Sequence, residues 1–229
     1  MDARTRLGAA ALGLAGLVGA ACSGDDPAAG ATTTAGAGAE VVDAFVAAYE
    51  RSRTASFVIG QTFSRSAGDR GELAYGVRVA QRPPDDRLTV GGGTAAGKVD
   101  GLVVRCVTEP SGTSECFDGG AAAADAPVVA AEVEDLRRLV TGDPAPYLVA
   151  VDADGCFELT LQVRFPSAPY GLEAMFCFDD ASGAPTRVRV DHGEDIVDDT
   201  VTDRIRTDVT DADFRVGDLG TLPVPQTGD

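Results

Sequence analysis

Apolar side chains recur at helical spacing in two stretches of the chain, residues 39–53 and 127–141. The apolar positions are Val42, Phe45, Val46 and Tyr49 in the first stretch and Val129, Val133, Leu136 and Val140 in the second. Such a stripe is typical of an amphipathic helix with one buried face. Pro127 suits the first turn of a helix and Gly142 the position just after its end. The pattern therefore predicts two amphipathic helices.

Elsewhere the apolar period changes to two, which is typical of strands with one buried face. The alternation predicts strands at residues 57–63, 73–79, 87–90, 99–107, 157–163, 172–178, 186–190 and 200–207. In the sequence, groups of strands precede and follow one helix, and another helix comes before all of them; this order predicts an α+β fold. In this fold a curved antiparallel β-sheet packs on an N-terminal helix and one further helix.

The first 22 residues have the layout of an export signal. Arg4 and Arg6 precede a run from Leu7 to Ala21 without a charged or polar side chain, and small residues stand directly before Cys22. This layout predicts a secretory signal peptide. The position of Cys22 is similar to that in bacterial lipoprotein signals, in which the cysteine receives a diacylglyceryl group. A cleaved signal without acylation and a retained helix stay open, although the apolar run spans only about 22 Å of a roughly 30 Å hydrocarbon core.

A change in composition after the signal indicates how the chain is divided. Residues 23–38 are mostly Gly, Ala, Thr and Asp, a composition that cannot form a core. We therefore expect a signal peptide at residues 1–21, and an acylated cysteine with a flexible tether at residues 22–38. A single α+β domain is expected at residues 39–219, followed by a disordered tail at residues 220–229.

Five cysteines bear on the compartment. If Cys22 carries the lipid, four cysteines remain, an even number that can pair as disulfides in an oxidising environment. Turn-rich segments lie midway between Cys106 and Cys116 and midway between Cys156 and Cys177. Of the three possible pairings we therefore expect these two, each across adjacent strands. Zinc is the rival, but no two of these cysteines have the short gap typical of zinc ligands.

Charge excludes one class of partner. The chain has 36 acidic and 19 basic residues, a net charge of −17, and such a surface repels nucleic acid and anionic lipid headgroups. Membrane attachment would then depend on acyl chains. Only one of the 19 basic residues is a lysine, Lys98. This bias is typical of a GC-rich genome such as that of an actinobacterium, so part of the acidity is compositional background.

Two motifs raise the question of catalysis. His192 is the single histidine, it lies in a charged segment, and no Gly-x-Ser-x-Gly elbow accompanies it. Gly92 to Lys98 nearly spells a phosphate-binding loop, but Val99 stands where a Ser or Thr should bind Mg²⁺. That stretch is better interpreted as a flexible connection between strands. We expect no catalytic residue, no cofactor and no enzyme activity.

Acidic residues are dense near the end of the chain, where calcium is the natural cation to consider. They are Asp191, Glu194, Asp195, Asp198, Asp199, Asp203, Asp208, Asp211 and Asp213. The spacing of a calcium loop is missing, so a solvated acidic face is the better interpretation, while cation binding by residues 191–213 stays open. The stretch from Asp152 to Gly155 is likewise interpreted as a turn, and no metal site is expected.

The predicted strands carry more large apolar side chains than two helices can cover. Candidates for lining a ligand cavity are Phe57, Ile59, Phe63, Tyr75, Val77, Phe157, Leu159, Leu161 and Phe176. A curved sheet with few covering helices can leave an apolar cavity open to a ligand. The alternative is a filled core, in which case the chain would be a structural or protein-interaction module.

The order of the predicted elements resembles a known family. A front helix, strands, the step from Arg82 to Arg87 and the segment from Val99 to Val104 are similar to the LolA/LprG-type lipoprotein superfamily. This resemblance implies an unclosed β half-barrel that packs on helices and encloses a hydrophobic cavity. Mycobacterial members of the LppX and LprG type are acylated and are implicated in carrying lipids or lipoglycans between membrane and envelope. The resemblance implies no polar catalytic set.

These observations lead to one expectation about place and function. We expect a lipoprotein held by acyl chains on the extracytoplasmic face of the cell membrane. Its half-barrel would bind or carry a lipid-like or lipoglycan molecule of the envelope. No nucleic-acid partner is expected, and the oligomeric state stays open.

Overall fold

The structure, a computed structural model, describes residues 37–108, 114–165 and 168–215. All of them fall within one compact unit of the chain. The expected signal peptide, Cys22, most of the expected tether and the expected tail lie outside the described residues. Within the described ranges, no helix combines the length and the hydropathy that a membrane span requires.

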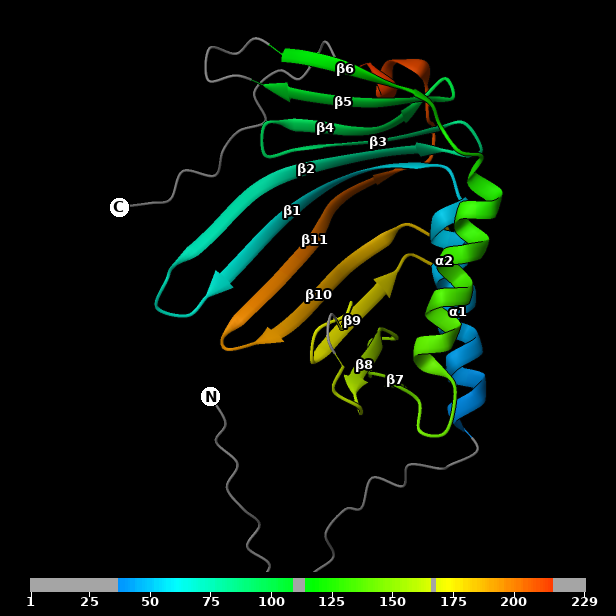
Figure 1. Ribbon diagram of the computed structural model, residues 1–229, viewed down its shortest axis with the longest axis vertical. Coiled ribbons are helices and arrows are strands. Elements are labelled where there is room, and N and C mark those ends of the chain that lie inside the picture. The colour runs from blue at the N-terminus through cyan, green and yellow to red at the C-terminus, as the bar shows by residue number, and fades with distance from the viewer. Residues whose placement is uncertain (1–36, 109–113, 166–167, 216–229) are drawn as a thin grey trace, which may run out of the picture. The chain divides into compact units, whose positions relative to one another are not determined.

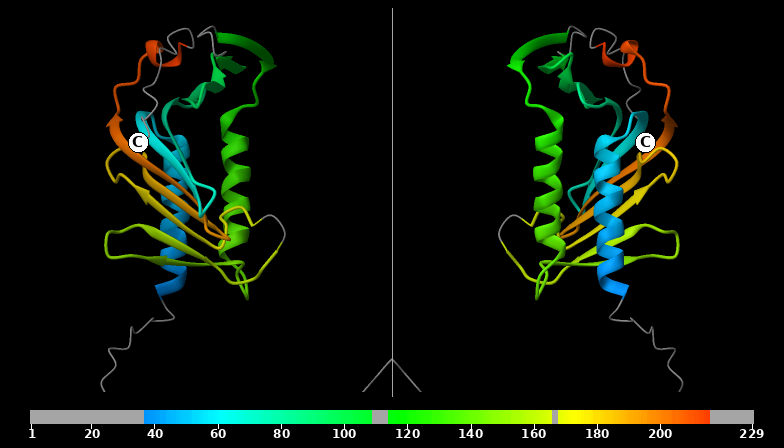
Figure 2. Two further views of the ribbon diagram at one scale, coloured as in Figure 1. Left: turned by 90° about the vertical axis from the view of Figure 1, so that its left-hand side faces the viewer. Right: turned by 90° about the vertical axis from the view of Figure 1, so that its right-hand side faces the viewer.

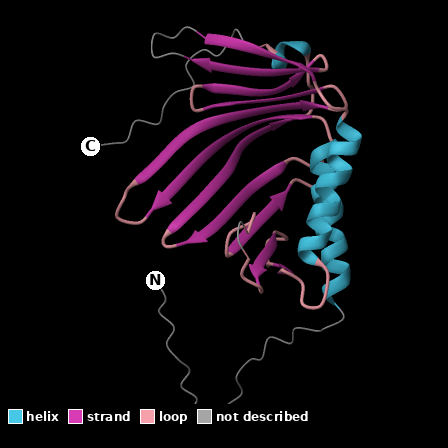
Figure 3. Cartoon of the chain, viewed as in Figure 1, coloured by secondary structure: helices cyan, strands magenta, loops and turns pink. Residues whose placement is uncertain are grey.

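In this part of the chain two α-helices and a short 3-10 helix accompany eleven strands (Figures 1 and 3). The helices are α1 (Ala37–Thr54), α2 (Asp125–Val140) and η1 (Asp211–Phe214). The strands before α2 are β1 (Phe57–Ala67), β2 (Glu72–Arg82), β3 (Asp86–Gly91), β4 (Thr94–Val99), β5 (Leu102–Thr108) and β6 (Ser114–Ala121). The strands after α2 are β7 (Tyr147–Val151), β8 (Phe157–Leu161), β9 (Glu173–Phe178), β10 (Pro185–Gly193) and β11 (Ile196–Arg206).

The strands form one antiparallel sheet in the order β6-β5-β4-β3-β2-β1-β11-β10-β9-β8-β7. Two meanders therefore meet in the middle, where β1 pairs with β11 across most of the length of the chain. The sheet bends around the side on which the two helices stand (Figure 2). The predicted fold class, a curved antiparallel sheet packed on an N-terminal helix and one further helix, is confirmed.

The strand register determines which side chains share a face of the sheet. Gln81 lies opposite Phe57, and its Nε2 donates hydrogen bonds to the carbonyl oxygens of Ser52 and Ala55 at the end of α1, at 2.8 and 2.7 Å. The side of the sheet that carries Gln81 and Phe57 is called the helix face. Because successive strand residues point to opposite sides, the alternate positions of β1, among them Gly60, belong to the outer face.

The main core lies on the helix face, between the two helices and strands β7 to β9. Phe45 of α1 is fully buried, and its ring centroid lies 5.3 Å from that of Phe157 and 5.5 Å from that of Phe176. The Arg53 guanidinium joins α1 to Glu132 of α2 by an ion pair of 2.6 Å. Large side chains such as Phe45 contribute about 1.5–3 kcal/mol each on burial, so this end of the sheet is held by packing.

A second, smaller core lies on the outer face, where η1 covers β1 to β5. Phe214 packs in this cluster with Val58 and Leu88. The Arg82 guanidinium lies 5.0 Å from the ring centroid of Phe214 and pairs with Asp211 at 2.7 Å. The chain after β11 is therefore fastened across the outer face by a cation–π contact and an ion pair.

The alternation of apolar residues does not predict three of the strands, β4, β6 and β7. The interpretation of Gly92 to Lys98 as a flexible connection is wrong, because most of this stretch is β4, paired with both β3 and β5. Gly92 and Gly93, with φ of 58° and 76°, form the turn before it. Small residues such as those of β4 give no apolar alternation, so the pattern of apolar residues does not predict this strand.

Candidate ligand-binding site

Gly60 stands between two arginines on the outer face. In the register of the sheet it lies opposite Arg78 of β2 on one side and opposite Arg204 of β11 on the other. Neighbouring strands lie about 4.8 Å apart, so the backbones of the two arginines are about 10 Å apart with no side chain between them. A Cβ built on Gly60 would meet nothing within 4 Å. The space above this glycine is therefore open.

This space belongs to a pocket of about 770 Å³ over strands β1, β2 and β11. The described residues that line it are Val58, Ile59, Gly60, Gln61, Thr62, Gly76, Val77, Arg78, Asp203, Arg204, Ile205 and Arg206. Gly76, opposite Thr62 in the register, also leaves room around its Cα. The volume lies in the range of about 300–1,000 Å³ that is typical of small-molecule sites. The pocket exists because two adjacent strands each have a glycine, Gly60 and Gly76, on the outer face.

A β-bulge bends β11 beside the pocket. The register between β1 and β11 shifts after Gly60, which leaves Asp203 as an extra residue between Thr202 and Arg204. The Thr62 hydroxyl donates a hydrogen bond of 3.1 Å to the Asp203 carboxylate. Bulges of this kind re-aim side chains and increase the local twist. Here the bulge places Asp203 and Arg204 in succession along one edge of the pocket.

Arg206 is neutralised by carboxylates next to the pocket. Its guanidinium pairs with Asp213 of η1 and with Asp208. Burial raises the pKa of Asp213, but hydrogen bonds from the Thr210 backbone and hydroxyl and from Arg206 outweigh it, so the pKa lies below its usual value. Asp213 is therefore ionised at neutral pH and holds Arg206 in place.

The other two arginines of the pocket have no carboxylate partner. Arg78 is half-buried, and its Nη1 donates one hydrogen bond of 2.7 Å to the carbonyl oxygen of Asp213. Arg204 is exposed and makes no hydrogen bond or ion pair with any described residue. A guanidinium has five N–H donors, so most of the donors of Arg78 and all of those of Arg204 are available. The site thus presents two free positive charges on a chain whose net charge is −17.

Five of the nine residues that the sequence predicts for a cavity lie on β1 and β2. Ile59 and Val77 line the pocket, where their strands form its floor. Phe57 packs in a small buried cluster at the end of α1. Phe63 and Tyr75 contact each other, with ring centroids 5.0 Å apart, farther along the β1–β2 hairpin.

The other four predicted residues lie in the main core. Leu159 and Phe176 are buried there, with Phe157 and Leu161 packed against them, around Phe45 of α1. The α1 helix fills this end of the helix face because its apolar stripe points directly at the strands. The structure therefore does not bring the nine residues together at one place.

The sequence analysis did not single out Gly60, Gly76, Arg78 or Arg204. One signal was present: a glycine inside an otherwise alternating strand marks a bulge or a site where something approaches the backbone closely. Gly60 and Gly76 both interrupt such strands. The pairing of Arg204 with this region depends on a register between residues about 140 apart, which local patterns do not report.

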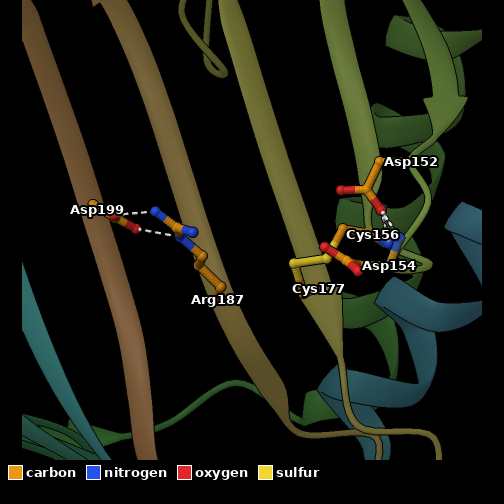
Figure 4. The surroundings of a disulfide bond; sticks show 6 residues. All are labelled: Asp152, Asp154, Cys156, Cys177, Arg187 and Asp199. Carbon is orange, nitrogen blue, oxygen red and sulfur yellow. Dashed lines mark hydrogen bonds and ion pairs between the residues drawn. A yellow bond between two sulfur atoms is a disulfide. The ribbon is translucent and has the colours of Figure 1, made fainter.

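The two expected disulfides, Cys106–Cys116 and Cys156–Cys177, are both formed. Figure 4 shows the second one beside the turn that begins at Asp152, whose Oδ1 accepts hydrogen bonds of 2.9 Å from the backbone amides of Asp154 and Cys156. These hydrogen bonds close the turn, as the sequence predicted for this stretch. They engage one of the two carboxylate oxygens of Asp152.

Several carboxylates of the acidic stretch 191–213 are bound to cationic side chains. Asp198 of β11 pairs with Arg65 of β1 at 2.5 Å and with His192 of β10 at 3.0 Å. Asp199 pairs with Arg187 at 2.6 Å (Figure 4). The hydrogen bond from Arg65 holds the pKa of Asp198 below its usual value. Among the described residues, no group of three or more His, Cys, Asp or Glu side chains is placed to hold a metal ion.

No protein-family model matches the chain, and no curated protein sequence matches it either. Solved structures do show partial similarity. A LolA superfamily protein from Nitrosomonas europaea is 12% identical, with 76% of this chain and 97% of that chain covered and a TM-score of 0.33. An outer membrane lipoprotein-sorting protein domain from Vibrio parahaemolyticus is 12% identical, with the same coverage and a TM-score of 0.34.

A further solved structure is a complex of two proteins. The MucA/MucB complex of Pseudomonas aeruginosa contains a chain that is 13% identical, with 80% of this chain covered and a TM-score of 0.48. This chain spans 63% of the length of that one. Similarity at this level concerns the arrangement of the sheet and helices and transfers neither a ligand nor a partner.

Proposed function

We propose that this protein is an exported lipoprotein, anchored through an acylated Cys22, whose half-barrel domain binds or carries a lipid-like molecule of the cell envelope. The observation that carries the proposal is the pocket of about 770 Å³ over β1, β2 and β11. Its floor has no side chain at Gly60 and Gly76, so an acyl chain can lie directly against the sheet. Pockets of this size and lining hold single small ligands.

The proposed location is supported by chemistry at the cysteines. Two disulfides are expected outside the cytoplasm, where thiols are not kept reduced. The layout of residues 1–22 supports export and acylation, since small residues precede Cys22. A negative surface repels anionic headgroups, so acyl chains are the natural means of attachment.

We also propose that the protein is not an enzyme. His192, the single histidine, is held by Asp198 on a solvated part of the sheet. The one potential nucleophile and the one potential general base in the described lining are Thr62 and Asp203; they hydrogen-bond to each other, and no further described side chain orients them. This lining is better suited to binding a ligand than to catalysing a reaction of it.

Native mass spectrometry tests the proposed function. A full-length Cys22→Ser chain, which cannot be acylated, is exported, purified without detergent and mixed with a total lipid extract. We expect a mass increase of one lipid per chain, and a loss of this increase in Gly76→Leu, because the leucine side chain would stand on the bare floor against which the lipid is expected to lie. A clean lipid-free mass in repeated preparations would overturn the proposal.

A protein-interaction module is the second candidate. It is favoured by the filled core around Phe45 and by exposed apolar side chains on β5 and β6, of which Phe117 is 59% exposed. The same experiment separates the two functions, because an interaction module takes up no lipid and is indifferent to Gly76→Leu.

A further inference from the structure

The row formed by Arg204, Gly60 and Arg78 has the geometry of a clamp. The three residues lie side by side on adjacent strands and on one face of the sheet, with the glycine in the middle. Any other residue at position 60 would place a side chain between the two guanidinium groups. With glycine there, a ligand group can reach the backbone and be approached by an arginine from each side.

The electrostatics favour an anion at this position. Arg78 and Arg204 carry unpaired positive charges on backbones about 10 Å apart, so the two charges repel each other, and an anion bound between them would attract both. Most other basic side chains near the middle of the sheet are already neutralised, such as Arg65 by Asp198 and Arg187 by Asp199. Asp203 is the one carboxylate among the described lining residues, and it already accepts a hydrogen bond from Thr62.

The remainder of the pocket favours an apolar chain attached to that anion. Beyond the arginines and the Thr62–Asp203 pair, the lining of the outer face includes Val58 and the backbone at Gly60 and Gly76, which carries no side chain. Inorganic phosphate would fill only a small part of about 770 Å³. A molecule with one anionic head and one or two acyl chains matches both halves of the site.

We propose that Arg78 and Arg204 clamp the anionic headgroup of a membrane phospholipid over Gly60, on the face of the sheet opposite the helices. This inference rests on the proposed function and adds the chemical class of the ligand and the residues that select it. Guanidinium groups suit this task, because their planar forks match the oxygens of a phosphate. The clamp also accounts for attraction of an anionic lipid to a chain that is acidic elsewhere.

The test compares two lysophospholipids with the same acyl chain, lysophosphatidylglycerol and lysophosphatidylcholine, below their micelle concentrations. Binding to the full-length Cys22→Ser chain is measured by calorimetry. We expect the anionic lipid to bind at least about tenfold more tightly than the zwitterionic one. We expect Arg204→Gln and Arg78→Gln each to remove most of this preference while leaving the affinity for lysophosphatidylcholine within about twofold.

Arg189→Gln is the matched control. Arg189 is an exposed arginine of β10, on the same face as Arg187 and outside the pocket lining, and it makes no ion pair with a described residue. The control should keep the full preference for the anionic lipid. Far-ultraviolet circular dichroism of all three variants checks that the sheet is intact, and Arg78→Lys should restore part of the preference because the charge returns.

The outcomes separate the inference from the proposed function. If the two lipids bind equally well, or if Arg204→Gln and Arg78→Gln leave the preference unchanged, the clamp is wrong while lipid binding stands. If neither lipid binds, the proposed function fails and the clamp with it. If inorganic phosphate alone binds as tightly as the anionic lipid, the site is an anion site without a lipid, and the inference is overturned.

Discussion

Two glycines on the outer face show how different the role of a missing side chain can be. A Cβ on Gly97 of β4 would lie 1.9 Å from the carbonyl oxygen of Arg87, which no side-chain movement can relieve. A Cβ on Gly60 would meet nothing within 4 Å. Gly97 is therefore required by the close approach of two strands, whereas Gly60 leaves a space that the fold itself does not need.

This difference predicts opposite tolerance of the two positions to alanine. Gly97→Ala should lower the free energy of unfolding by about 3 kcal/mol or more, because backbone has to move. Gly60→Ala should change it by less than about 1 kcal/mol. Urea unfolding of both variants measures the difference, and equal losses would contradict the register described for β3 and β4.

The charged residues of β1, β10 and β11 add a pH dependence. Asp198 accepts a hydrogen bond from Arg65, which lowers its pKa, and it also contacts His192. A carboxyl whose pKa is lower in the folded chain stabilises it above the unfolded pKa of about 3.9, and this stabilisation disappears as the pH falls through the folded value. The contribution is therefore complete at neutral pH and absent in strong acid.

Asp198→Asn should lower the free energy of unfolding by about 1 kcal/mol at pH 7, a value limited by the exposure of Arg65. The difference in the free energy of unfolding between this variant and the wild type should disappear below about pH 4. Asp69→Asn is the control, since the Asp69 side chain is exposed and makes no ion pair with a described residue. If this difference in the free energy of unfolding stays constant from pH 7 to pH 3, the packing of the Asp198 side chain, and not its charge, stabilises the fold.

At the scale of elements, the helices were predictable and part of the sheet was not. The stripes over 39–53 and 127–141 match α1 and α2 to within two residues at each end, because each stripe faces a single core. β4 and β6 contain small and polar residues and no clean alternation. β7 follows two prolines, and its five residues are all apolar, so it shows no alternation either.

The candidate site could not be predicted from the sequence for a different reason. Its central row requires β1 to pair with β11, a contact between residues near 60 and residues near 204. Periodicity reports which face a residue occupies and not which strand lies beside it. The predicted apolar residues of β8 and β9 were correctly assigned to strands, but the helices that cover them turn this part of the sheet into core.

The disulfide between Cys156 and Cys177 ties the strands β8 and β9 next to the turn at Asp152. It closes a loop with a sequence separation of 21 residues. In the chain-entropy description, a loop of this length stabilises the folded state by about 3 kcal/mol.

Replacing both cysteines by serine should therefore lower the free energy of unfolding by about 3 kcal/mol in the absence of reductant. In the presence of dithiothreitol the variant and the wild type should unfold at nearly the same urea concentration, because both then lack the bond. A difference that persists under reducing conditions would assign the loss to the serine side chains and not to the missing cross-link.

For the whole molecule, the proposed membrane attachment has to be reconciled with an acidic surface. With a net charge of −17, its surface is repelled by anionic lipids, and the described helices include no membrane span. The proposed attachment through acyl chains at Cys22 would resolve this conflict, because acyl insertion does not depend on charge. The proposed pocket then meets single lipid molecules and not the bilayer surface.

Cys22→Ala should move the protein from the membrane fraction to the soluble exported fraction when it is produced in a bacterium that acylates lipoproteins. Cys106→Ala/Cys116→Ala keeps Cys22 and should stay with the membrane. Mass analysis of the N-terminal peptide completes the measurement. An unmodified N-terminal methionine on the mature chain would contradict both export and acylation.

Photo-crosslinking with a diazirine-bearing lysophosphatidylglycerol measures directly where a lipid contacts the chain. We expect labelled peptides from three strands, covering residues 58–62, 76–78 and 203–206, and a loss of label in Gly76→Leu. Labelling confined to α1, α2 and strands β7 to β9, or unchanged by Gly76→Leu, would contradict the outer-face pocket as the binding site.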